Sequence, residues 1–296
     1  MKKKLVLTTA VLVLALCAVF AFAACNTGAD DGILFGRELL RLTAQVDILQ
    51  NLDNGSADIG IMDSVMAGHY LTHGSYVGKI ASLDLFEFPA EEYGIGAKKG
   101  NDALVAKINE GLIALAANGT LGTIAAEYGL QNEILVNGDT ENPKASATDD
   151  SWNNVVASGS LVIGYTVFEP IAYREGGELT GFDVELAEAV VDHLNAEYGT
   201  AVEIEWIEIE WSTKQTQLEN GSLDLVWNGM TLTDEVMNGM STTVPYLANR
   251  QTLIVRSADA DKYADMRSFF ITAKDAVVAV ESGSAADLLM TVETAQ

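Results

Sequence analysis

Three strand-like runs of this sequence are each followed at once by residues that could hold a small solute. These residues are Asp63, the stretch Asn228-Gly229-Met230-Thr231 and the stretch Ser282-Gly283-Ser284-Ala285. Ligands of open α/β sheets bind beyond the carboxyl ends of the strands, so functional residues are expected at these positions. The free N–H groups of a helix that begins near Ser284 would form a pocket for a carboxylate. Asp63 could instead cap a helix over 64–71, and Ser284 could be a plain N-cap.

Two of these runs belong to a repeated phrase, LDNGSADIGI at 52–61 and LENGSLDLVW at 218–227. In both copies a leucine ends a helix, Asn-Gly supplies a left-handed cap, and Asp leads into a strand. The phrase is therefore helix-to-strand turn chemistry, whether or not it also marks two related lobes. The residues that differ, and that would carry function, come after each copy.

Strand-like and helix-like segments alternate along most of the chain, which predicts an α/β fold. Asp183 is predicted to cap a helix that Gly199 ends, and a second long helix is predicted to begin at Asn101 or Asp102. A change in the phase of apolar alternation predicts a bulge near 206–207.

The first 24 residues read as an export leader, with three lysines followed by an apolar run. The run closes with Phe22-Ala23-Ala24-Cys25, which resembles a bacterial lipobox, so Cys25 is the predicted lipidation site. An uncleaved signal anchor is the alternative, and Cys17 after Leu16 fits the lipobox pattern less well. Residues 25–32 are expected to form a flexible tether.

The chain carries 17 Lys+Arg against 42 Asp+Glu, a formal charge of −25. This acidity argues against binding to nucleic acid and against electrostatic docking to an anionic membrane. Once the leader is removed only Cys25 is left, so no intramolecular disulfide is expected. His69 and His73 have the i, i+4 spacing of metal ligands, but no third ligand is near them in sequence. We therefore expect neither a metal nor a cofactor.

Together these motifs resemble the type 2 solute-binding proteins that deliver amino acids to ABC importers. The family's opening is similar to residues 152–296, which contain LVIGYTVFEPIAY, GELTGFDVELAEAV and VVAVESGSAADLL. The family's closing half is similar to residues 43–136, which contain EEYGIGAKKGN and INEGLIALAANGTLGTIAAEYG. The simplest account of this swapped order is a circular permutation, and a tandem pair of truncated modules is the rival account.

The resemblance implies a circularly permuted, two-lobed type 2 periplasmic-binding-protein fold of the α/β class, with a hinge and an interlobe cleft. The implied hinge lies near 87–93 and 255–258. The implied parts are the leader 1–24, the tether 25–32, lobe 2 over 33–88 and 256–296, lobe 1 over 89–136 and 152–255, and a linker over 137–151 that joins the family's old termini.

Carried over residue by residue, the resemblance implies ligand contacts from both lobes. In lobe 2, Asp63 matches the aspartate that binds the ligand's ammonium, and Ser284 lies where the carboxylate is held. Glu281 and Ala285, on either side of that loop, are further ligand-binding candidates.

In lobe 1, Thr231 and the backbone at Asn228 and Gly229 match the family's contacts to the ligand's carboxylate and ammonium. Phe168 and Trp211 match the aromatic positions around the ligand's aliphatic part. Aromatic side chains in such runs are otherwise usually core residues.

One position departs from the family pattern, in which an arginine of Thr-x-Thr-x-x-Arg holds the ligand's carboxylate. Val236 stands at that place here. Losing such a charged pair would cost on the order of 1.5–3 kcal/mol of binding free energy. Lys214 and Arg250 are the cations nearest in sequence that could substitute. Otherwise the ligand's anionic group is held differently or is absent.

The implied protein is a monomeric, lipid-anchored solute receptor outside the cytoplasmic membrane, which would work with an ABC permease and its ATPase. A dehydratase of the same fold is the alternative from another class, for which Glu281 and Glu169 are conceivable general acids. A lipoprotein that senses a solute without transporting it is a third possibility.

Overall fold

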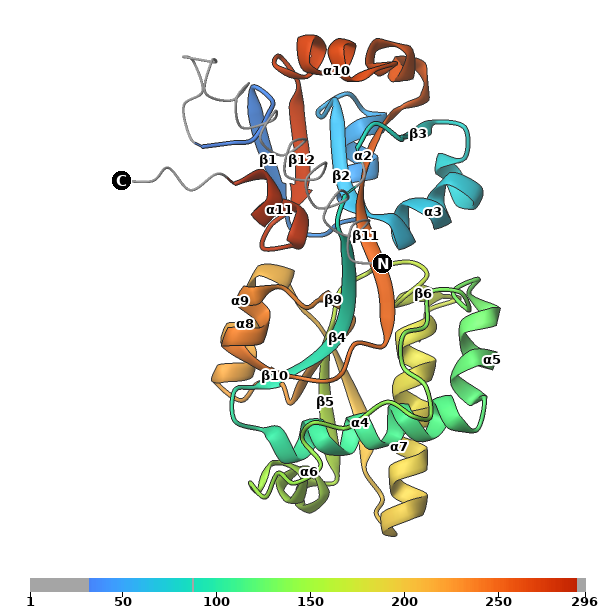
Figure 1. Ribbon diagram of the computed structural model, residues 1–296, viewed down its shortest axis with the longest axis vertical. Helices are drawn as coiled ribbons and strands as arrows, with labels where there is room; N and C mark the ends of the chain where they lie inside the picture. Colours follow the sequence, from blue (N-terminus) through green and yellow to red (C-terminus); the bar gives the residue numbers. More distant parts are fainter. Residues whose placement is uncertain (1–31, 87, 292–296) are drawn as a thin grey trace, which may run out of the picture.

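The computed structural model describes residues 32–86 and 88–291. The expected leader, Cys25 and position 87 of the expected hinge lie outside the described residues. No helix within the described ranges is long and apolar enough to cross a membrane. The described chain forms two α/β lobes that follow one another along the long axis of the molecule (Figure 1).

Ten of the described strands form one mixed sheet that runs through both lobes. Its main path is β1-β12-β2-β11-β4-β9-β5-β8, with β10 beside β4 and β3 beside β11, while β6 and β7 form a separate hairpin. The strands are β1 (Glu38–Leu42), β2 (Ile59–Asp63), β3 (Ile80–Leu83), β4 (Ala90–Lys98), β5 (Ser160–Tyr165), β6 (Tyr173–Glu175), β7 (Glu178–Thr180), β8 (Glu203–Glu208), β9 (Leu225–Thr231), β10 (Met240–Thr242), β11 (Leu247–Arg256) and β12 (Val277–Glu281).

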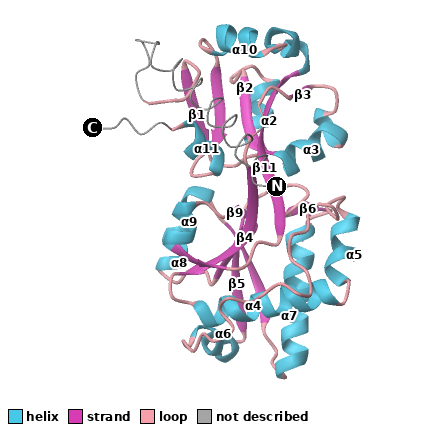
Figure 2. Cartoon of the chain, viewed as in Figure 1, coloured by secondary structure: helices cyan, strands magenta, loops and turns pink. Residues whose placement is uncertain are grey.

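Helices surround the strands of each lobe (Figure 2). The predicted long helix at Asp102 is confirmed, and its apolar face is buried at Leu104, Ile108 and Leu112. The described α-helices are α2 (Asp47–Asp53), α3 (Ser64–Thr72), α4 (Asp102–Ala117), α5 (Thr120–Glu127), α6 (Ser151–Ser158), α7 (Phe182–Tyr198), α8 (Lys214–Glu219), α9 (Asp234–Gly239), α10 (Met266–Ala273) and α11 (Ala285–Met290), and the described 3₁₀ turns are η1 (Gly74–Tyr76), η2 (Trp211–Thr213) and η3 (Ser257–Tyr263).

The two lobes are built on the same strand pattern. In lobe 2, β12 lies between β1 and β2 and is parallel to both, and β11 runs antiparallel to β2. In lobe 1, β5 lies between β8 and β9 and is parallel to both, and β4 runs antiparallel to β9. Each lobe therefore directs the carboxyl ends of three parallel strands to one side.

The strand β11 joins the lobes because it changes partner along its length. Residues 247–250 pair with β4 of lobe 1, and residues 251–255 pair with β2 of lobe 2. This change comes at Arg250 and Gln251, earlier in the chain than the crossing expected at 255–258. The chain's other passage between the lobes ends where β4 begins, at Ala90, which lies within the range 87–93 expected from the sequence.

Both copies of the repeated phrase form the same turn. Gly55 and Gly221 have φ angles of 81° and 80°. The N–H of the serine that follows each glycine donates to the asparagine side chain two residues earlier, at 2.8 Å for Ser56 and 2.9 Å for Ser222. The prediction of a left-handed cap is confirmed in both copies.

The aspartate of the phrase also has an equivalent role in each lobe. The N–H of Val277 in β12 donates to the Asp58 carboxylate at 3.0 Å, and the N–H of Asp58 donates back to the Val277 carbonyl. Asp224 makes the same two bonds with Val162 of β5. The phrase therefore forms the same local turn in both lobes, and in each lobe its aspartate links the following strand to its parallel neighbour.

Two local predictions are wrong. The register between β8 and β5 is continuous from Glu203 to Glu208, without a bulge. The apolar phase changes because both faces of β8 are partly covered, Ile204 by the main core and Ile207 by the cluster around Trp211. Asp183 does not cap its helix, because Gly181 occupies the N-cap and the Asp183 carboxylate points into the protein.

The stretch 137–150 contains neither helix nor strand, as its composition predicts. It is nevertheless held against α4. The Asn142 side chain donates to the Ala106 carbonyl at 2.9 Å, and Lys144 forms an ion pair with Asp102. The Asp149 carboxylate accepts from the N–H of Ala103 at 2.7 Å. This stretch therefore lies as an ordered strap along lobe 1.

Candidate functional site

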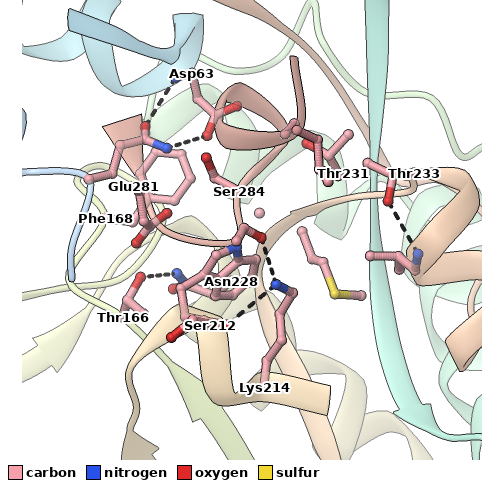
Figure 3. A pocket seen from close by; sticks show the side chains of 18 of the residues that line it. Asp63, Thr166, Phe168, Ser212, Lys214, Asn228, Thr231, Thr233, Glu281 and Ser284 are labelled. Atoms are coloured by element: carbon pink, nitrogen blue, oxygen red, sulfur yellow. Dashed lines mark hydrogen bonds between the residues drawn. The ribbon is translucent and has the colours of Figure 1, made fainter. Parts of the chain in front are cut away.

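A cavity of about 120 Å³ lies between the two lobes. Each lobe has three parallel strands, and residues at or just after the carboxyl ends of all six strands line the cavity. Figure 3 shows these side chains pointing into it. The lining residues are Gln45, Asp63, Thr166, Phe168, Trp211, Ser212, Lys214, Gln215, Asn228, Gly229, Met230, Thr231, Thr233, Glu235, Val236, Glu281, Gly283, Ser284, Ala285 and Leu288.

The structure brings together every ligand-binding candidate taken from the sequence. Each of them lines this cavity: Asp63, Phe168, Trp211, Lys214, Asn228, Gly229, Thr231, Glu281, Ser284 and Ala285. Arg250 is not part of the described lining, since it lies exposed on β11. Glu169 is also outside this lining and lies 3.8 Å from His69. Of the two candidate cations, only Lys214 is in position to meet a ligand.

Asp63 ends β2 and is buried. It occupies the N-cap position of α3, yet its carboxylate makes no capping bond within the described structure. Gln45 donates to this carboxylate at 2.7 Å, and Gln251 and Asn249 of β11 donate to its other oxygen. Burial and the nearby Glu91 carboxylate raise the pKa of Asp63 to about 6.

Glu281 ends β12, and its side chain is almost completely buried, with 4% of its surface exposed. Its Oε1 atom has no hydrogen-bond partner among the described residues. Burial and the Asp63 charge raise the pKa of Glu281 to about 8, against the opposing effect of Lys214. At neutral pH the carboxyl group is therefore mostly protonated in this structure.

Lys214 is the only cationic side chain among the described lining residues. Its Nζ donates to the Gly283 carbonyl of lobe 2 at 2.9 Å and to the Trp211 carbonyl at 3.3 Å (Figure 3). It also lies 4.7 Å from the centre of the Trp211 ring. Burial lowers the pKa of Lys214, while the Glu281 charge acts in the other direction.

The loop before α11 was expected to offer free N–H groups to a carboxylate, and in the structure three of its N–H groups, those of residues 282–284, are engaged. The N–H of Ser282 donates to Leu42, and that of Ser284 donates to Glu281. The N–H of Gly283 donates to the Asp287 carboxylate at 2.9 Å. The Ser284 hydroxyl accepts from the N–H of Asp287, so Ser284 is the N-cap of α11. The protein's own acceptors thus bind three N–H groups of this loop, while Ala285, the first residue of α11, lines the cavity.

The donors on the lobe 1 wall are engaged in the same way. The N–H of Gly229 donates to the buried Asp183 carboxylate at 2.7 Å, and the Thr231 hydroxyl donates to Glu91 at 3.2 Å. The Asn228 side chain bonds the Thr166 hydroxyl at 2.8 Å. These residues face the cavity, but their donors already have partners.

The apolar part of the lining includes Phe168, Trp211 and Val236. Phe168 and Trp211 retain only 4% and 6% of their surface exposed, so each is a core residue with one side on the cavity. Val236, which replaces the family's arginine, is 7% exposed on the first turn of α9. This wall can pack against hydrocarbon and contributes no charge.

Several lining residues were missed from the sequence. Gln45 follows β1, a five-residue strand whose partner β12 lies more than 230 positions further along the chain. Thr166 and Ser212 follow the ends of β5 and β8, so a search past every strand end would have found them. Thr233 and Glu235 begin α9, beside the Thr231 that was proposed.

His69 lies on α3 (Ser64–Thr72), and His73 directly follows the end of that helix. Their rings stack at 4.8 Å. No group of three or more metal-ligating side chains exists within 32–86 and 88–291.

The sequence comparisons match one part of the chain. Residues 161–293 match the family "Bacterial extracellular solute-binding proteins, family 3". The chain is similar to the "Probable amino-acid-binding protein YxeM" of Bacillus subtilis, with 32% identity over 120 residues, which are 40% of this chain and 41% of that protein. It is 29% identical to the "Arginine-binding extracellular protein ArtP" of the same species, over 36% of this chain and 40% of that protein. The chain thus spans about two fifths of these relatives.

Among solved structures, the chain is similar to an ABC uptake transporter substrate binding protein from Streptococcus pneumoniae with bound histidine. The identity is 32%, over 30% of this chain and 35% of that chain, with a TM-score of 0.27. It is also similar to an ancestral cyclohexadienyl dehydratase, with 27% identity over 29% of this chain and 34% of that chain, and a TM-score of 0.26.

The raised pKa of Glu281 predicts how the stability of the protein depends on pH. Between about pH 5 and pH 8 the folded protein keeps a proton that the unfolded chain loses, because the pKa is about 8 in place of the ordinary 4.5. The free energy of unfolding should therefore fall as the pH rises through this range, by up to about 1.4 kcal/mol per pH unit for this one group.

Urea unfolding of the wild type and of Glu281→Gln at several pH values measures this dependence. In Glu281→Gln the free energy of unfolding should fall less steeply with pH than in the wild type. Glu178→Gln, which removes an exposed carboxylate on β7, should leave the wild-type slope unchanged. Equal slopes for the wild type and Glu281→Gln would contradict the assignment.

Proposed function

We propose that this protein is an extracytoplasmic substrate-binding lipoprotein of an ABC importer. It would bind an amino acid or a similar small polar solute between two closing lobes. The observation that carries the proposal is an interlobe cavity on which six strand ends meet, three from each lobe. The family match over 161–293 and the names of the relatives support a solute-binding role.

Binding would act through closure of the lobes. Among the described strands, β11 alone pairs with strands of both lobes, with β4 in lobe 1 and with β2 in lobe 2. A ligand that touches both walls gains contacts that it has only when the lobes are together, and this difference shifts the population towards the closed form. The bond from Lys214 of lobe 1 to Gly283 of lobe 2, at 2.9 Å, supports the view that the described form is the closed one.

The order of the parts is proposed to be a circular permutation of the family's order. Residues 90–127 form one lobe with β5, β8 and β9, although the strap over 137–150 lies between them in the chain. Residues 38–83 form the other lobe with β12 and α11. A tandem pair of truncated modules would be expected to place each part in a unit of its own, so this interleaving supports permutation.

An enzymatic role is the second candidate, because of one observation. Glu281 is a buried carboxyl group in the cavity whose pKa of about 8 keeps it protonated at neutral pH, as a general acid requires. Release of water and carbon dioxide from a prephenate-like acid by the purified protein would favour this role. We favour binding, because the matched family and the named relatives are binding proteins.

A disulfide across the cleft should trap the closed form. A Cβ atom on Gly283 would lie 3.6 Å from the Ser212 Cβ, within the range for a disulfide. In Ser212→Cys/Gly283→Cys, oxidation should slow solute binding and release at least tenfold, and reduction should restore both. The solute is first found by thermal shift among the twenty L-amino acids and their decarboxylated amines, since saturation a hundredfold above Kd adds about 2.7 kcal/mol.

Stopped-flow measurements on the oxidised and reduced double variant give these rates. The single variants Ser212→Cys and Gly283→Ala control for the new thiol and for the strain of a side chain at φ 71°. Equal rates in the oxidised and reduced protein would contradict binding by lobe closure. The absence of any stabilising solute would contradict the proposed function.

Lipid anchoring is tested at the two cysteines of the leader region. In a bacterial host, the wild type and Cys17→Ser should be found in the membrane fraction and should take up labelled palmitate. Cys25→Ser should lose the label, because the thiol that accepts the lipid is missing. Label that remains on Cys25→Ser and disappears from Cys17→Ser would move the anchor to the other site.

A further inference from the structure

The cleft has few free hydrogen-bond donors for a ligand carboxylate. Several of the donors expected at that carboxylate are bonded to acceptors of the protein itself. Gly229 donates to Asp183, Thr231 to Glu91, and Gly283 to Asp287. Lys214 donates to two backbone carbonyls. Val236 supplies an apolar side chain where the family has an arginine.

The same cleft has acceptors to offer. Glu281 is buried and lines the cavity, and its Oε1 atom has no partner within the described chain. Such an atom is costly to bury unless something bonds to it. Asp63 and Glu235 also line the cavity, against the single cation Lys214 among the described lining residues. A ligand that donates hydrogen bonds and carries positive charge matches this balance.

The charge continues outside the cavity. An adjoining cavity of about 400 Å³ shares Thr233, Glu235, Ala285 and Leu288 with the first. Glu91 and Asp234 add their carboxylates to it, and no cationic side chain is among its described lining residues. A carboxylate that entered by this route would meet like charges, and an ammonium would meet opposite ones.

We propose that the cleft selects small organic amines that carry no carboxylate over the α-amino acids of the same carbon skeleton. The ligand's ammonium is received by Glu281 and Asp63, and its hydrocarbon packs on Phe168 and Val236. This selectivity rests on the proposed solute-binding function, because it concerns the same cavity.

Matched pairs that differ only by the carboxylate test this selectivity. The pairs are lysine and cadaverine, ornithine and putrescine, arginine and agmatine, and histidine and histamine, titrated by calorimetry into the purified protein. In the pair that binds best, the amine should bind at least tenfold more tightly than the amino acid. Tighter binding of the amino acid than of its amine would overturn the selectivity and leave the proposed solute-binding function intact. Failure of every pair would count against the proposed function itself, and the selectivity would fall with it.

Two variants test the residues that cause the preference. Val236→Arg restores the family's cation and should improve binding of the amino acid in the best pair at least tenfold, with a smaller effect on the amine. Glu281→Gln should weaken the affinity for the amine at least tenfold. The exposed control Glu178→Gln should change this affinity less than twofold. Thermal unfolding shows that each variant is folded. An amine affinity that is unchanged in Glu281→Gln would overturn the role of Glu281 as the acceptor.

Discussion

Three carboxylates of the protein accept hydrogen bonds from donors on the walls of the interlobe cleft. Asp183 takes the N–H of Gly229, Glu91 takes the Thr231 hydroxyl, and Asp287 takes the N–H of Gly283. Donors bound in this way are not available to a ligand unless these bonds break, and the buried Asp183 carboxylate would be destabilised without its donor. The bonds therefore help to fix the shape of the cleft, and in the proposed function they disfavour a ligand carboxylate.

The two lobes reach this arrangement through the same local construction. Asp58 and Asp224 each tie the start of a strand to its parallel neighbour, and the strands β2 and β9 that follow end at Asp63 and Thr231. Because parallel strands in one lobe all point the same way, their polar end residues gather at one edge. Two such edges facing each other make a cavity from segments that are far apart in the chain.

The sequence was informative where the signal is local. The left-handed caps at Gly55 and Gly221 depend on adjacent residues, and the candidates past the strand ends were found because a strand end can be read from a short apolar run. Contacts between distant residues could not be read in this way. Thr231 and Glu91 are 140 positions apart and Gly229 and Asp183 are 46 apart, so nothing in either segment indicates that a donor is already engaged. Asp183 was placed as a helix cap for the same reason.

Proton release on binding tests most directly whether the cleft accepts a cation at Glu281. The carboxyl group is mostly protonated at pH 7, and an ammonium beside it favours the ionised form. Calorimetric titration of the best-binding amine at pH 7, in two buffers with different ionisation enthalpies, should show release of about one proton per ligand bound, and Glu281→Gln should abolish most of it. Proton uptake, or binding with no proton change in the wild type, would contradict the account.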